Sequence, residues 1–331
     1  MTTSRTIRFA ASMKQALLSL NRRPLKPLII AGVIIGCAIG VALYPHAGFD
    51  WYVYFSQTAN RPITDASVYY PAWIYLILRP ITYLPNSFLG YTLLNAGLLI
   101  MAVYLTKTPN WSIITTLPLF WILFYGQIDA WLVFGVALAE WSLSNRHPVW
   151  MGLALLLLTS KPHVGGPLLL YYAWNVRHPK ILLVPAGVLA LSLLVFGFWP
   201  IIFLQRMFSV NVEQFAVQAV NVNISGWPYS LILLPALLGL WKYIPPTQKS
   251  SLILALTCIT IPYCPIYSLA AMLVFNVGWL ALILFPAWFG PQYAITWGFL
   301  FALACVLAPL AQGLKARLAL NKNPSPLSPS S

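Results

Sequence analysis

Acidic residues are rare in this sequence, and one of them lies where chemistry is possible. The 331 residues include only five Asp and Glu. Asp50 follows the first long apolar segment and is flanked by Phe49 and Trp51. Partial burial of a carboxylate among aromatic rings raises its proton affinity, so Asp50 has the properties of a general base. The alternative is an interfacial aspartate that is simply solvated by headgroup water, beside aromatic residues that are common there.

Two short turns between apolar segments supply further polar groups. The first contains Gln127 and Asp129, whose side chains can hydrogen-bond a ligand with several hydroxyl groups. The second contains Lys161 and His163, and an ammonium group with a nearby imidazole suits a phosphate. Each turn also has a simpler explanation. The side chains of Gln127 and Asp129 can hydrogen-bond the backbone groups of a tight turn. Lys161 can extend from the end of a span toward the lipid headgroups.

Residues 67–85 form an amphipathic, aromatic segment that is interrupted by prolines. We expect an interfacial helix there, on the non-cytoplasmic face of the membrane. Tyr69 and Tyr70 can present phenol hydroxyls to a polar substrate, or they belong to an aromatic belt. Arg79 stands among Leu, Ile and Pro, where a guanidinium group either pairs with an anion or reaches the interface along its aliphatic stem.

The elements that must position these residues are membrane helices. Hydrophobic residues make up 60% of the chain and charged residues 7%, with a mean hydropathy of +0.78. A soluble protein of this length needs far more surface charge. The sequence therefore predicts an all-α polytopic membrane protein with about 10–12 transmembrane helices. The cysteines show no CxxC spacing, so no metal site is expected.

The distribution of positive charge predicts the orientation of the chain. The net charge is +14, and six basic residues precede the first span. This is the positive-inside pattern, which favours membrane lipids over nucleic acid as the partner. We therefore expect a multi-pass plasma-membrane protein with a cytoplasmic basic arm (1–27), a transmembrane domain (28–312) and a basic, Ser/Pro-rich disordered tail (313–331). Alternation of the spans places Asp50 and both polar turns on the non-cytoplasmic face.

The order of these motifs resembles that of the GT-C glycosyltransferases. The greatest similarity is to the polyprenol-phosphate-mannose-dependent mannosyltransferases of glycosyltransferase family 87, over roughly residues 28–290. The family pattern has Asn at the position of Asp129 and an aspartate at the position of Ser268. The matching motifs are Asp50, Tyr69-Tyr70-Pro71, Gly126-Gln127-Ile128-Asp129, Lys161-Pro162 and Pro262-Tyr263-Cys264-Pro265-Ile266-Tyr267-Ser268.

The resemblance implies a GT-C-like helix bundle and an inverting sugar transfer on the non-cytoplasmic face. A hexose, with mannose as the expected sugar, would pass from a polyprenyl-phosphate carrier to a hydroxyl of a lipid or glycan acceptor. Asp50 would be the catalytic base. The donor phosphate would be held by Lys161, His163 and Arg79. The sugar and acceptor would be bound by Tyr69, Tyr70, Gln127, Asp129, Tyr263 and Tyr267.

No metal or other cofactor is expected for this reaction, because the donor is a monophosphate diester and the sequence contains no Asp-x-Asp pair. Two other functions stay open. A polytopic lipid or sugar transporter would also gather polar residues in a membrane cavity, although it would more often place ionisable residues at mid-membrane. A non-catalytic membrane subunit descended from a transferase would keep the same motifs.

Overall fold

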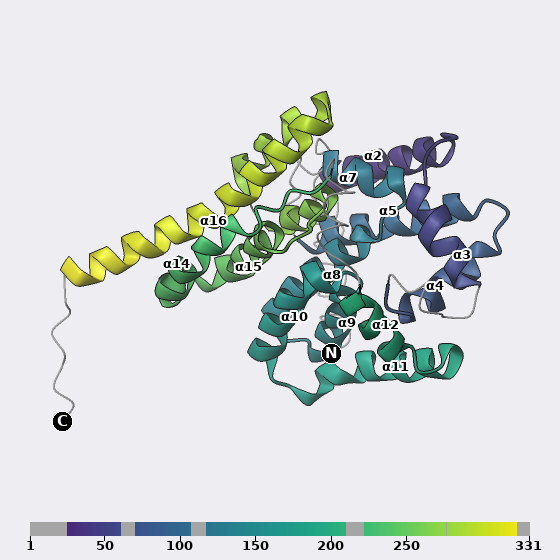
Figure 1. Cartoon of the computed structure of the whole chain (residues 1–331), viewed down its shortest axis with the longest axis horizontal. Coiled ribbons are helices and arrows are strands. Elements are labelled where there is room, and N and C mark those ends of the chain that lie inside the picture. Colours follow the sequence, from purple (N-terminus) through teal and green to yellow (C-terminus); the bar gives the residue numbers. More distant parts are fainter. Residues whose placement is uncertain (1–24, 61–69, 107–116, 210–221, 276, 323–331) are drawn as a thin grey trace, which may run out of the picture.

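The computed structural model describes residues 25–60, 70–106, 117–209, 222–275 and 277–322 (Figure 1). Within these ranges the protein is helical, and the only β-type pairing is an isolated bridge between Asn223 and Pro265. Three helices are long and apolar enough to cross a membrane: Ser87–Leu105, Pro179–Phe196 and Tyr293–Ala319. These features agree with the expected all-α membrane protein. The GT-C arrangement of ten to twelve spans stays a prediction.

The helices follow one another along the chain with short connections. The α-helices are α2 (Leu25–Ala42), α3 (Ser56–Ala59), α4 (Trp73–Thr82), α5 (Ser87–Leu105), α7 (Leu117–Tyr125), α8 (Asp129–Asn145), α9 (Pro148–Leu158), α10 (Pro162–Val176), α11 (Leu183–Phe196), α12 (Trp199–Ser209), α14 (Leu233–Leu240), α15 (Pro246–Thr260) and α16 (Pro291–Lys322). A π-helical turn, η1 (Trp51–Phe55), precedes α3, and the 3₁₀ segments are η2 (Pro179–Leu182), η3 (Tyr229–Ile232), η4 (Trp241–Tyr243), η5 (Ile266–Val274) and η6 (Gly278–Phe289).

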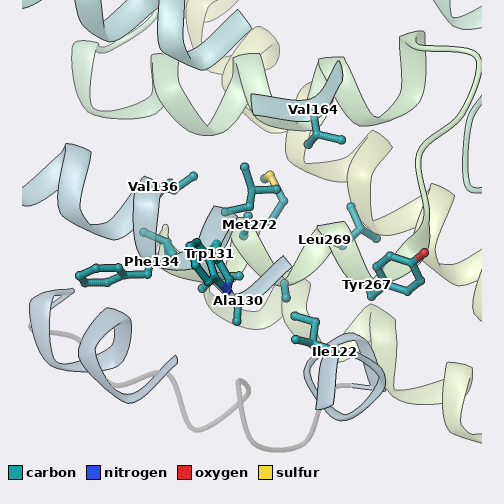
Figure 2. Packing of buried hydrophobic residues seen from close by; sticks show 14 of the residues in the cluster. Ile122, Ala130, Trp131, Phe134, Val136, Val164, Tyr267, Leu269 and Met272 are labelled. Atoms are coloured by element: carbon teal, nitrogen blue, oxygen red, sulfur yellow. The ribbon is translucent and has the colours of Figure 1, made fainter. Parts of the chain in front are cut away.

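Helix α8 lies at the centre of the bundle. Every residue from Asp129 to Ala139 is buried, as expected for a helix that is apolar on all sides. It packs against α5, α9, α10 and η5. Figure 2 shows Trp131 and Phe134 of α8 in the same buried cluster as Met272 of η5. The end of α8 that carries Asp129 is therefore held from several directions.

Glycine allows the neighbouring helices to approach closely. A Cβ atom on Gly165 of α10 would lie 2.2 Å from the carbonyl oxygen of Leu158 in α9. That distance is far below van der Waals contact, so α9 and α10 can meet at this angle only because residue 165 has no side chain. The tight turn between them contains Ser160 and Lys161.

The segment expected at the membrane interface contains the amphipathic helix α4. Trp73, Ile74 and Leu78 are buried on one side of it, whereas Ile77 and Arg79 are exposed. Residues 67–69 lie outside the described part of the chain. The helix is confirmed, and its position at an interface stays a prediction.

The structure corrects two expected boundaries near the C-terminus. Residues 313–322, which we placed in a disordered tail, continue α16 to Lys322, and this end of the helix extends away from the bundle (Figure 1). The reason is composition: residues 314–320 are strong helix formers, and the Ser/Pro-rich stretch begins only after Asn323. At the other end, residues 25–27 of the expected arm already belong to α2. Residues 1–24 and 323–331 lie outside the described ranges.

The apolar stretch of residues 266–289 does not form one regular α-helix in its described part. This part of the chain forms η5 and η6, two 3₁₀ segments separated by extended backbone at Phe275. Pro286 lacks a backbone N–H and Gly278 has a low helix propensity, so neither favours a regular α-helix here.

A buried carboxylate and lysine cluster as the candidate active site

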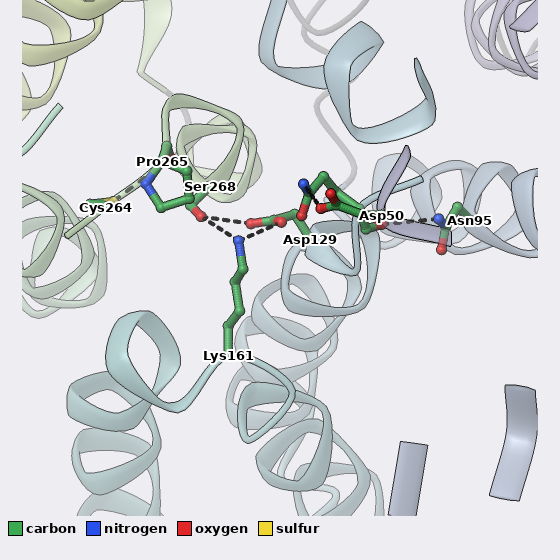
Figure 3. Close-up of polar contacts among 8 residues, drawn as sticks. Asp50, Asn95, Asp129, Lys161, Cys264, Pro265 and Ser268 are labelled. Carbon is green, nitrogen blue, oxygen red and sulfur yellow. Dashed lines mark hydrogen bonds and ion pairs between the residues drawn. The ribbon is translucent and has the colours of Figure 1, made fainter. Parts of the chain in front are cut away.

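Asp129, Lys161 and Ser268 form a closed set of contacts, which we call the lysine cluster (Figure 3). The Lys161 Nζ atom donates to Asp129 Oδ2 at 2.7 Å and to Ser268 Oγ at 3.2 Å. Ser268 Oγ in turn donates to Asp129 Oδ1 at 2.6 Å. All three side chains are buried, with at most 4% of their surface exposed. A buried charge is stable only when it is paired, and here each charge has its partner.

Each member of the lysine cluster is placed by the end of a helical segment. Asp129 is the first residue of α8, where the positive end of the helix dipole stabilises a carboxylate. Lys161 immediately precedes α10, and Pro162 fixes the backbone of its first turn. Ser268 lies in the first turn of η5, just after Pro265.

Residues 222–226 hold the turn that carries Ser268. The backbone N–H of Ile224 donates to the Cys264 carbonyl at 2.8 Å, and that of Ile266 donates to the Val222 carbonyl at 2.8 Å. The Asn223 side chain accepts from the Cys264 N–H at 2.9 Å and donates to the Pro262 carbonyl at 3.2 Å. The position of Ser268 thus depends on a segment that precedes it by some forty residues.

Asp50 joins the site from the helical turn that directly precedes η1. Its Oδ2 atom accepts a hydrogen bond from the Gln127 carboxamide, in the turn that leads directly to Asp129. Asp50 is 8% exposed and Gln127 is 4% exposed. The structure thus places Gln127 beside Asp50, and their location on the non-cytoplasmic face stays a prediction.

Two glycines allow the backbone before Asp50 to pack closely against the turn that contains Gln127. Gly48 has a φ of +84° and Gly126 a φ of +69°, in the region that disfavours other residues. The Gly48 N–H donates to the carbonyl of Phe124 at 2.7 Å. A Cβ atom on Gly126 would lie 3.2 Å from Trp51, beside Asp50. Glycine at both positions brings the two backbones close enough for Gln127 to reach Asp50.

The Asp50 carboxyl has an unusual affinity for protons. Asp50 lies outside the three helices that are long enough to span a membrane. Burial raises its pKa from 3.8 to about 7, against the opposing effect of the positive charge on Lys161. The negative charge of Asp129 adds to the increase, and the Gln127 hydrogen bond reduces it. A carboxylate with a pKa near neutrality can accept a proton and release it again under physiological conditions.

Aromatic residues border the polar groups. The Lys161 ammonium group lies 4.5 Å from the centre of the Tyr267 ring, as in a cation–π contact. The rings of His163 and Tyr263 are 6.3 Å apart, and that of Tyr70 is 4.8 Å from Phe55. The Nε2 atom of His163 is buried and has no hydrogen-bond partner among the described residues. The imidazole is thus able to bind a group that enters the site.

Two predicted site residues are not placed in this cluster. Arg79 is exposed in the last turn of α4, and in the described part of the chain no hydrogen bond or ion pair links its guanidinium group to Asp50 or Asp129. Tyr69 lies outside the described residues. Their roles in binding a donor or acceptor stay predictions.

Sequence reasoning missed Asn95 of α5. Its side chain is fully buried, donates to the backbone carbonyl of Gln127 at 3.0 Å and accepts from Trp131 Nε1 at 3.2 Å. The available signal was a carboxamide within an otherwise apolar span. The described residues contain no group of three or more His, Cys, Asp or Glu that could hold a metal ion.

Comparisons of the chain with protein-family models, curated proteins and solved structures found no match. The chemistry of the site therefore has to be argued from its own residues. It offers a carboxylate with a pKa near 7, a buried ammonium group and an imidazole whose Nε2 atom has no hydrogen-bond partner in the described part of the chain. This combination can accept a proton at one point and bind an anion at another.

Proposed function

We propose that this protein is an inverting glycosyltransferase of GT-C type, with ten to twelve spans and its site on the non-cytoplasmic face of the plasma membrane. It moves a hexose, with mannose as the expected sugar, from a polyprenyl-phosphate carrier to a lipid or glycan hydroxyl. The observation that carries the proposal is the burial of Asp50, a potential base, beside the lysine cluster. The order of motifs in the sequence supports the same function.

The reaction assigns separate tasks to the two parts of the site. Asp50 accepts the proton of the acceptor hydroxyl as its oxygen attacks the anomeric carbon. Attack comes from the face opposite the carrier phosphate, so the bond between sugar and phosphate breaks with inversion. The phosphate departs with the bonding electron pair, and Lys161 and His163 stabilise its charge.

Lys161 can take part without leaving its partners. An ammonium group has three N–H donors, and Asp129 and Ser268 accept from two of them. The third donor can bind a phosphate oxygen. Asp129 supplies the counterion that a buried ammonium group needs.

The test is sugar transfer from a panel of radiolabelled polyprenyl-phosphate sugars, in membranes that contain wild type, Asp50→Asn or Tyr52→Phe. Tyr52 is half exposed and adjoins the same helical turn, so its variant controls for local perturbation. We expect transfer by wild type and Tyr52→Phe, and a loss of about 100-fold or more in Asp50→Asn.

Either of two results would count against the proposal. If Asp50→Asn transfers sugar like wild type, Asp50 is not the base. If no donor in the panel is used by any of the proteins, the transporter and the non-catalytic subunit become the better explanations, and uptake of labelled lipid-linked sugar into vesicles would separate these two.

A further inference from the structure

Asn95 is a fully buried polar residue that the proposed reaction does not use. It lies in α5, one of the three helices long enough to span a membrane. A carboxamide in such a position is costly unless its donors and acceptor are satisfied. Asn95 uses its acceptor in a contact to α8 and one of its two N–H donors in a contact to the turn before α8, so both contacts lead toward the candidate site.

The contacts of Asn95 form a chain that ends at Asp50. Trp131 donates its indole N–H to Asn95 Oδ1 at 3.2 Å, which fixes the orientation of the carboxamide. Asn95 then donates from Nδ2 to the backbone carbonyl of Gln127 at 3.0 Å. The same residue, Gln127, donates its side-chain N–H to Asp50. Figure 3 draws Asn95 and Asp50 together, with dashed lines for the hydrogen bonds among the residues shown.

We propose that Asn95 is a positioning residue for Asp50: oriented by Trp131, it fixes the backbone of Gln127 and thereby directs the Gln127 carboxamide to the Asp50 carboxylate. The proposal rests on the proposed function in one respect only, the naming of Asp50 as the base. The chain of contacts itself is independent of the reaction.

This role makes a prediction that a purely structural role does not. A hydrogen bond between helices stabilises the bundle, but it need not affect the protonation of Asp50. If Asn95 directs Gln127, its loss weakens a hydrogen bond that favours the charged carboxylate. The pKa of Asp50 then rises. The other titratable groups that influence Asp50, or feel its charge, are Lys161, Asp129, Tyr70, Tyr91, Tyr125, Tyr263 and Tyr267.

The experiment measures protonation of Asp50 without any sugar donor. Dicyclohexylcarbodiimide modifies protonated carboxyl groups in apolar surroundings, and mass spectrometry of the peptide containing Asp50 gives the extent of modification at each pH. The purified full-length variants are Asn95→Leu, Trp131→Phe and Thr92→Val. Thr92 is the matched control, since it lies one turn before Asn95, is equally buried and donates only to the Phe88 carbonyl of its own helix.

For Asn95→Leu we expect the pH of half-modification to rise by about 0.5 to 1 unit, with a smaller rise for Trp131→Phe and none for Thr92→Val. An unchanged titration in Asn95→Leu overturns the proposal, as does an equal shift in Thr92→Val. Should Asn95→Leu fail to fold, Trp131→Phe decides, and its unchanged titration has the same meaning.

A transfer assay on the same variants separates this inference from the proposed function. If the proposed function and the role of Asn95 are both correct, the pH at which the transfer rate is half-maximal shifts by the same amount as the pH of half-modification. The KM for the donor does not change. Shifted labelling without any transfer supports Asn95 as a positioning residue and counts against the transferase. Normal transfer with an unchanged pH of half-modification supports the transferase and counts against Asn95 as a positioning residue.

Discussion

Ser268 donates a hydrogen bond of 2.6 Å to Asp129, the carboxylate that also pairs with the ammonium group of Lys161. Two backbone positions, 129 and 268, thus place an oxygen atom beside the same lysine. Both positions are close enough to the ammonium group of Lys161 for a carboxylate there to act as its counterion.

The first prediction is that the carboxylate can be moved from position 129 to position 268. Asp129→Asn leaves the buried Lys161 without a counterion and should cost about 3 to 5 kcal/mol of stability. Adding Ser268→Asp returns a carboxylate to the other side of the ammonium group and should recover most of the loss. The measurement is the thermal denaturation of the purified proteins in one detergent. No recovery in the double variant would show that position 268 cannot provide the counterion.

The second prediction concerns the coupling of the ion pair. Lys161→Met and Asp129→Asn should each destabilise the protein, because each leaves one buried charge unpaired. The double variant should lose less stability than the sum of the two, with a coupling of at least about 1 kcal/mol. A double-mutant cycle of unfolding free energies in denaturant measures this quantity. Additive losses would mean that the two charges do not stabilise each other.

The third prediction is the pH dependence of transfer. The base must be unprotonated to accept a proton, and burial raises the pKa of Asp50 to about 7. The rate should therefore increase as the pH rises through about 7 and level off above it. Initial rates at saturating donor give the profile. A flat profile through this region would exclude Asp50 as the titrating base.

The fourth prediction is the pH dependence of stability, which requires no activity. The folded protein holds the Asp50 proton up to about pH 7, whereas the unfolded chain releases it near pH 4. Between these values the folded state binds more protons, so the contribution of Asp50 to stability declines as the pH rises from about 4 to 7. Melting temperatures of wild type and Asp50→Asn across this range test it, and the variant should lack this part of the decline.

The fifth prediction concerns the close packing of the Gln127 turn against the backbone next to Asp50. Gly126→Ala places a Cβ atom 3.2 Å from Trp51 at a φ of +69°, and should cost about 1 to 2 kcal/mol of stability as well as much of the transfer activity. Gly97→Ala is the matched control, since no atom lies within 4 Å of its added Cβ in α5. It should be neutral or slightly stabilising. Equal effects of the two substitutions would show that the close approach at Gly126 is unimportant.

The sequence could predict which polar residues share one side of the bundle, because each follows the end of an apolar segment. Asp50, Gln127, Asp129 and Lys161 were found in this way. It could not predict that Lys161 pairs with Asp129 or that Ser268 completes the contact. Those facts depend on the angle at which α8, α10 and η5 meet, and this angle depends on packing at particular atoms such as those around Gly165.

Two other differences have local causes. The sequence does not single out Asn95, because the mean hydropathy of its helix stays high despite one carboxamide. The importance of Asn95 comes from the two contacts that it makes. The end of α16 was misplaced because net charge and nearby Ser/Pro residues outweighed the helix propensity of residues 314–320. In both cases the deciding property belongs to single residues.

The separations along the chain imply an order of assembly for the site. Asp129 and Lys161 are 32 residues apart, so their ion pair can form within the α8–α10 segment alone. Ser268 is 107 residues from Lys161, and its contact closes a much longer loop. During synthesis the charged pair is therefore available early, and the hydroxyl that completes its coordination arrives only when the C-terminal third of the chain has packed.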